Sequence, residues 1–143
     1  MRQMRMAVAL MLAGALALGA ASCKDNMAPS LLEHMGGIDG VAKLMDNWKG
    51  AMAADASLAS ALTSADRDLV ASGMVGEIAK ATETPMPGGS VDLVKVLQEK
   101  NLSKAALKAM GAALQAATVT SNLSPDATQG VTSLWNAAAG KAD

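Results

Sequence analysis

The sequence predicts a single all-α domain of six to seven helices, and three observations lead to this prediction. About half of the 143 residues are apolar, Phe and Tyr are absent, and Trp48 and Trp135 are the only aromatic side chains besides His34, so apart from these the core must be built from aliphatic and thioether side chains. Ala, Leu and Met favour helix because they lose little side-chain freedom there. Runs of β-branched residues are nearly absent, which argues against a sheet, and apolar residues recur at spacings of three and four.

The first 22 residues are predicted to form a signal peptide that is not part of the folded domain. Arg2 and Arg5 give it a positive start, and residues 6–18 form an apolar segment that is too short to span a membrane comfortably. Small residues at 19–22 then lead to Cys23, the only cysteine of the chain. A single cysteine cannot form a disulfide within the chain.

This arrangement resembles the lipobox of bacterial lipoproteins, with Ala20 where Leu is usual. The resemblance implies cleavage before Cys23 and lipid on its sulfur and its new amino terminus, so that a lipid anchor holds the protein in the bacterial cell envelope facing the periplasm. Lys24 favours the outer membrane, and Asp25 leaves the inner membrane open. Residues 23–30 form a short tether. The alternative is an ordinary secretory signal that leaves Cys23 as a free thiol.

The folded domain is predicted to span residues 31–143. Ser30 is expected to cap a short helix over residues 31–35, which Gly36 and Gly37 end. Asp39 is expected to cap the next helix, over residues 40–54. The apolar positions of this helix form one buried stripe at helical spacing, made of Val41, Leu44, Met45, Trp48 and Met52.

A short helical segment over residues 55–62 begins at Asp55, and Ser64 or Asp66 is expected to cap a longer helix that ends near Thr82. The apolar stripe of this longer helix is Leu69, Val70, Met74, Ile78 and Ala81. Residues 84–89 are predicted to be a loop, because they contain two prolines and two glycines.

Three serines mark the remaining helix starts. Ser90 is expected to open a helix over residues 91–99, and Ser103 to cap a helix that ends near residue 118. Ser124 precedes a proline at the first helical position of the last helix, which ends near residue 139. These two long helices are expected to bury Leu107, Met110 and Leu114 in the first, and Val131, Leu134 and Trp135 in the second.

From residue 31 on, the order of segments resembles the truncated haemoglobins, a family of small bacterial globins, and most closely their group 1. The stretch LLEHMGGIDGVAKLMDNWKGAMAADASL is similar to the family's opening pattern of a short helix, Gly-Gly and a helix that ends in an acidic turn. The stretch MVGEIAKATETPMPGGSVDLVKVLQEKNLS is similar to its next block. The resemblance implies a two-on-two helical sandwich and, in the family, a bound haem.

The haem-pocket positions of the family fall on residues that differ from the family pattern. These are Leu97 at the proximal histidine position, Trp48 and Lys49 at the distal aromatic positions, Leu62 at the position of the stacking Phe, and Val70 and Met74 at the distal lining. A neutral imidazole holds globin iron, whereas leucine has no donor atom. The only histidine, His34, lies in the first short helix. Binding of haem through a proximal histidine is therefore not expected.

Other chemistry has little support in the sequence. No nucleophile lies near a histidine, and neither a zinc constellation nor a glycine-rich phosphate loop occurs, so we expect neither an enzyme nor a metal site. No basic stripe with interleaved aromatic residues occurs, so nucleic-acid binding is not expected. Methionines at helical spacing usually fill the core.

Three hypotheses follow. The first is a degenerate truncated-haemoglobin-like lipoprotein that acts as a periplasmic binding or interaction module with an unknown protein partner. The second is a haem protein for oxygen or redox chemistry that uses Met74, Lys49 or two methionines as ligands. The third concerns the emptied pocket, which either collapses around small aliphatic side chains or holds an apolar ligand such as a lipid.

Overall fold

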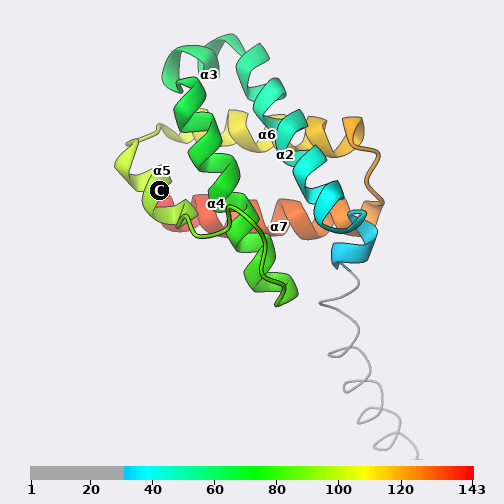
Figure 1. Cartoon of the computed structure of the whole chain (residues 1–143). Coiled ribbons are helices and arrows are strands. Elements are labelled where there is room, and N and C mark those ends of the chain that lie inside the picture. The colour runs from blue at the N-terminus through cyan, green and yellow to red at the C-terminus, as the bar shows by residue number, and fades with distance from the viewer. Residues whose placement is uncertain (1–30) are drawn as a thin grey trace, which may run out of the picture.

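The computed structural model describes residues 31–143, and all regular structure in this range is helical, which confirms the predicted all-α class. A single helical turn at residues 31–34 precedes the six longer elements. These are α2 (Gly37–Ala54), α3 (Ala56–Ala61), α4 (Ser64–Thr82), α5 (Leu93–Glu99), α6 (Lys104–Thr120) and α7 (Pro125–Ala142), drawn in Figure 1. No helix within residues 31–143 is long and apolar enough to cross a membrane. The predicted signal peptide, Cys23 and the tether lie outside the described residues.

The four long helices form two pairs that lie one over the other. Helix α2 packs against α4, and α6 packs against α7. In Figure 1, α2 and α4 lie in front, and α6 and α7 cross behind them. Contacts between α2 and α6 and between α4 and α7 join the two pairs, while short α3 packs on α2 and α6, and short α5 on α4 and α7. The hydrophobic core fills the space between the pairs.

The predicted stripe of α2 is confirmed, because each of its five members is at most 5% exposed. The stripe of α4 is partly wrong. Leu69 is 41% exposed and Ala81 is also exposed. Gly73 and Gly76, which the predicted stripe did not include, are buried. A Cβ atom at Gly73 would lie 2.8 Å from the Cα of Leu93, and one at Gly76 would lie 2.8 Å from the carbonyl oxygen of Gly89. Part of the buried surface of α4 is therefore formed by glycines against which residues 89–93 pack closely.

Several predicted helix starts were off by one to three residues. Thr63 caps α4, in place of Ser64 or Asp66. The Thr63 hydroxyl accepts from the Asp66 N–H, and the Asp66 carboxylate accepts from the Thr63 N–H, at 3.1 and 3.0 Å. Several residues near a helix start have side chains that could cap it. The cap is the one whose backbone is still extended, which here is Thr63.

Of the other predicted caps, some are wrong and some are confirmed. Helix α5 is capped by Asp92 instead of Ser90, and α2 starts at Gly37 without a side-chain cap, so Asp39 lies in its first turn. The caps by Ser103 and Ser124 are confirmed. Helices α6 and α7 run beyond their predicted ends, and within α7 Leu134 is only half-buried while Trp135 is 2% exposed.

Candidate functional site

The family-based positions are buried in the hydrophobic core, with a single exception. Leu62, Val70, Met74, Leu97 and Trp48 all belong to the buried core cluster. They come from four different parts of the chain: α2, the residue after α3, α4 and α5. The core therefore includes residues that are far apart in sequence.

The packing at these positions is closed. Trp48, Val70 and Met74 have no exposed surface, and Leu62 and Leu97 are 1% exposed. Since a side chain without exposed surface borders no space that a water molecule can enter, the interior around these three side chains has no room for a ligand in this structure. This density is typical of protein interiors, which pack like organic crystals.

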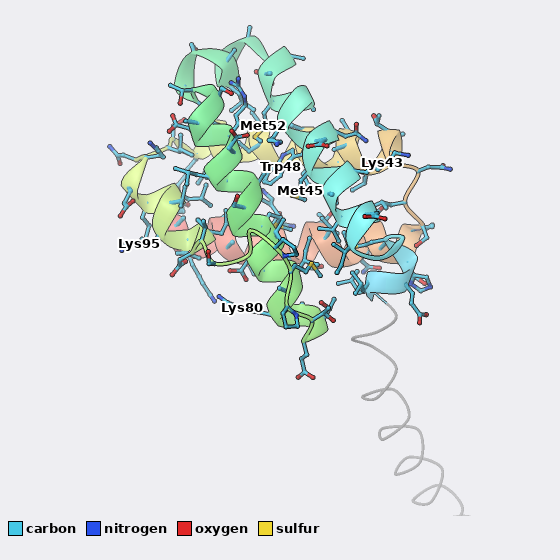
Figure 2. The ribbon with its side chains drawn as sticks, viewed as in Figure 1. Lys43, Met45, Trp48, Met52, Lys80 and Lys95 are labelled. Carbon is cyan, nitrogen blue, oxygen red and sulfur yellow. The ribbon has the colours of Figure 1, made fainter. Side chains whose placement is uncertain are left out.

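Trp48 holds the centre of this core by two contacts. Its indole N–H donates a hydrogen bond of 3.0 Å to the carbonyl oxygen of Met110 in α6. Its ring meets the ring of Trp135 in α7 edge to face, with centroids 5.4 Å apart. Figure 2 shows Trp48 between Met45 and Met52 along α2. The one polar atom of Trp48 is thus already bonded to the protein.

Lys49 is the exception among the family-based positions. Its side chain is 34% exposed, and its ammonium group lies 3.4 Å from a carboxylate oxygen of Asp46 in α2 and 3.4 Å from one of Asp68 in α4. The ion pair with Asp68 connects the two helices at the surface. The arrangement is usual for a lysine, whose stem lies along the protein while its charge stays in water.

A carboxylate fastens the start of α4 to the end of α5. The Lys100 ammonium group pairs with the carboxylate of Asp66. This contact, followed by the backbone N–H of Thr63, lowers the pKa of Asp66 below its ordinary value of 3.8, because both donors stabilise the charged form. The contact holds the segment that follows Leu97 against the helix that carries Met74.

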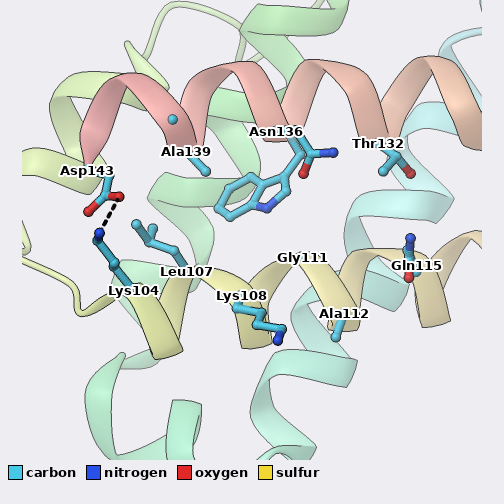
Figure 3. A pocket seen from close by; sticks show the side chains of 12 residues that line it. Lys104, Leu107, Lys108, Gly111, Ala112, Gln115, Thr132, Asn136, Ala139 and Asp143 are labelled. Atoms are coloured by element: carbon cyan, nitrogen blue, oxygen red, sulfur yellow. Dashed lines mark ion pairs between the residues drawn. The ribbon is translucent and has the colours of Figure 1, made fainter.

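A groove between α6 and α7 is the second candidate site, and sequence reasoning missed it. Its volume is about 480 Å³. Figure 3 shows the side chains that line it, from both helices. Exposed Lys104, Lys108, Gln115 and Asn136 are among these residues, so the groove opens on the solvent side of the helix pair. No motif predicts it, since it depends on how the two helices face each other.

Neither a search for metal-binding groups nor comparison with known proteins assigns a role to either site. No group of three or more His, Cys, Asp or Glu side chains within residues 31–143 is placed to hold a metal ion. His34 is exposed in the first helical turn. Comparison of the chain with protein-family models, with curated proteins and with solved structures found no match.

Proposed function

We propose that the protein is a truncated-haemoglobin-like lipoprotein whose helical domain holds no haem and serves as a binding or interaction module in the bacterial periplasm. The observation that carries the proposal is the closed core at the family-based positions. Leu97 and the four side chains around which a haem would have to fit are 0–1% exposed. The module would be anchored through Cys23, preferably in the outer membrane.

The arrangement of the helices supports the globin-like part of the proposal. Two stacked pairs, α2 with α4 and α6 with α7, are what a two-on-two sandwich requires. Short α5, which carries Leu97, packs on α4 and α7, so the proximal position faces the shared core. In a haem-binding member, the iron ligand would project from this place.

The residues present do not fit a haem. Leu97 offers no lone pair. An iron ligand would have to come from buried methionine thioethers, such as that of Met74, or from Lys49, whose ammonium group is engaged with two carboxylates. A porphyrin would also need a space that the packing around Trp48 and Met74 does not leave. Creating that space would expose apolar surface at a cost of about 25 cal/mol for each Å².

Haem titration of the mature domain, residues 24–143, tests the proposal that the domain binds no haem. We expect no saturable Soret band, and absorbance that rises like that of free haemin. Apomyoglobin under the same conditions is the positive control. A band that saturates at one haem per chain would contradict the proposal, and its loss in the Met74→Ala variant would then identify the methionine as the ligand.

Labelling of the full chain with radioactive palmitate in a bacterial host tests the anchor. We expect label on the wild-type chain and none on the Cys23→Ser variant, because the thioether-linked lipid is attached to the cysteine sulfur. Separation of the two membranes on a sucrose gradient should place the labelled chain in the outer membrane. An unlabelled wild-type chain in the soluble periplasmic fraction would show an ordinary secretory signal instead.

A further inference from the structure

The groove between α6 and α7 has the dimensions of a small-molecule site. Its volume of about 480 Å³ lies within the usual range for such sites, roughly 300–1,000 Å³. The side chains of Leu107, Ala112 and Ala139 give it apolar walls, and Gly111 and Gly140 add no side chain. Volume and apolar walls alone do not indicate which ligand would bind. The class of ligand has to be inferred from the polar atoms that reach the groove.

The first such atom is the indole nitrogen of Trp135. This side chain lines the groove although it is only 2% exposed, and its N–H makes no hydrogen bond within residues 31–143. A Cβ atom on Gly111 would lie 2.8 Å from this nitrogen. The missing side chain at Gly111 therefore leaves the N–H edge of the indole uncovered on the groove side. An indole N–H only donates, so it needs an acceptor.

Thr132 lies one turn before Trp135 on the same side of α7 and also lines the groove. Its hydroxyl oxygen is buried and has no hydrogen-bond partner in the described part of the chain. Buried polar groups nearly always have a partner, and a lone one carries a free-energy cost. Because this oxygen has almost no accessible surface, it does not reach the groove, and the indole N–H of Trp135 is the polar group that an oxygen acceptor of a ligand would meet there.

The two lysines that line the groove differ in their pairing. Lys104 forms an ion pair of 3.5 Å with the carboxylate of Asp143 at one end, drawn as a dashed line in Figure 3. Lys108 lies one turn further along α6 and three residues before Gly111, and its ammonium group makes no ion pair within residues 31–143. Of these two lysines, Lys108 is therefore the one whose charge is available to an anionic ligand in the groove.

We propose that the α6–α7 groove binds a small molecule with a carboxylate group and an apolar body. The carboxylate accepts the hydrogen bond of the Trp135 indole and lies beside the Lys108 ammonium group, while the apolar body packs against Leu107 and Ala139. This inference rests on the proposed binding role of the domain. It depends neither on the lipid anchor nor on the absence of haem.

The two tryptophans make the test selective, because the chain has only two indole N–H groups. The ¹⁵N-labelled full chain in an uncharged detergent is titrated with 4-phenylbutyrate, and the two indole signals are assigned with the Trp48→Phe variant. We expect the Trp135 signal to shift with a Kd of about 1 mM or lower. The Trp48 signal should stay in place, since that N–H is already bonded to Met110. The neutral amide, 4-phenylbutyramide, should bind at least about threefold more weakly.

Matched variants test whether the shift of the Trp135 signal arises from binding in the groove. Gly111→Ala places a methyl group over the indole nitrogen and should weaken binding about tenfold or more, the loss expected for a hydrogen bond to a charged acceptor. Gly50→Ala is the control, since a Cβ atom there meets nothing within 4 Å. Lys108→Gln changes an exposed side chain and should weaken binding about threefold.

Each remaining outcome decides the inference. It is overturned if the Trp135 signal does not move, if both indole signals move together, or if Gly111→Ala and Gly50→Ala bind equally well. Where Gly111→Ala does not fold, Lys108→Gln decides, and an unchanged affinity overturns the inference. Haem uptake in the separate titration would overturn the proposed function and leave this inference standing.

Discussion

Trp48 and Trp135 touch each other edge to face, yet they belong to two different environments. Trp48 is 0% exposed, and its N–H is bonded to the Met110 carbonyl oxygen. Trp135 is 2% exposed, and its N–H has no partner in the described part of the chain and faces a groove. The comparison separates a closed interior from an open outer face. It teaches that two indoles in contact with each other can differ in whether their N–H group is already bonded within the protein or faces a groove.

The largest expected effect is in the interior. Met74→Ala should lower the free energy of unfolding by about 3 kcal/mol, because it leaves a cavity in a packed core. Lys108→Ala in the groove should change it by no more than about 0.5 kcal/mol. Urea denaturation followed by far-UV circular dichroism measures both. A loss below about 1 kcal/mol for Met74→Ala would show that the interior is looser than its burial indicates.

Replacement by phenylalanine should lower the free energy of unfolding by different amounts at the two tryptophans. Both changes remove similar ring volume, but Trp48→Phe also removes the hydrogen bond to Met110, so it should cost about 1 kcal/mol more than Trp135→Phe. Urea midpoints followed by circular dichroism avoid the change in fluorescence. Equal losses would mean that the two indoles are not in different environments.

The contact between Asp66 and Lys100 joins α5 to α4, and its contribution to stability should depend on pH. The pKa of Asp66 is lowered in the folded state, so its contribution is present above the ordinary value of 3.8 and is lost as the pH falls through the lowered value. Asp66→Asn should cost about 1 kcal/mol at neutral pH, because it removes the ion pair with Lys100 and the charge that accepts the hydrogen bond of the Thr63 N–H. This difference from the wild type should shrink below pH 3.8.

Asp126→Asn, in the first turn of α7, is the matched control for Asp66→Asn. Asp126 makes no hydrogen bond or ion pair within residues 31–143, so only its favourable position near the helix N-terminus is lost, a smaller effect of about 0.5 kcal/mol. If both variants show the same pH profile, the contact of Asp66 with Lys100 contributes nothing specific.

The smallest effects come from two glycines inside helices. Gly50→Ala should raise stability by up to about 1 kcal/mol, because alanine favours helix and the site is open. Gly111→Ala has the same helical advantage, but its methyl group would meet the Trp135 nitrogen at 2.8 Å, so the gain should be cancelled. Melting temperatures of the two variants test this. Equal increases would show that the indole is not held against Gly111.

Local patterns predicted much of this fold correctly. The stripe of α2 and the caps at Ser103 and Ser124 depend on residues within a few positions of each other, and these predictions are confirmed. Leu69 was assigned to the core wrongly. The buried positions Gly73 and Gly76 were missed, because no local pattern predicts that residues 89–93 pack against α4 there. The positions suggested by the family resemblance are buried in the core, apart from surface residue Lys49. Their closed packing was one of the two outcomes that the sequence left open.

The sequence by itself determined the helical class and the helix order, because helix propensity, apolar spacing and capping act between residues close along the chain. It also determined that Leu97 carries no donor atom. The tertiary structure alone decided that the interior is closed and that an indole N–H faces a groove. Both depend on contacts between separate helices, such as that of Gly111 with Trp135, and the register of those helices follows from the packing of the whole core.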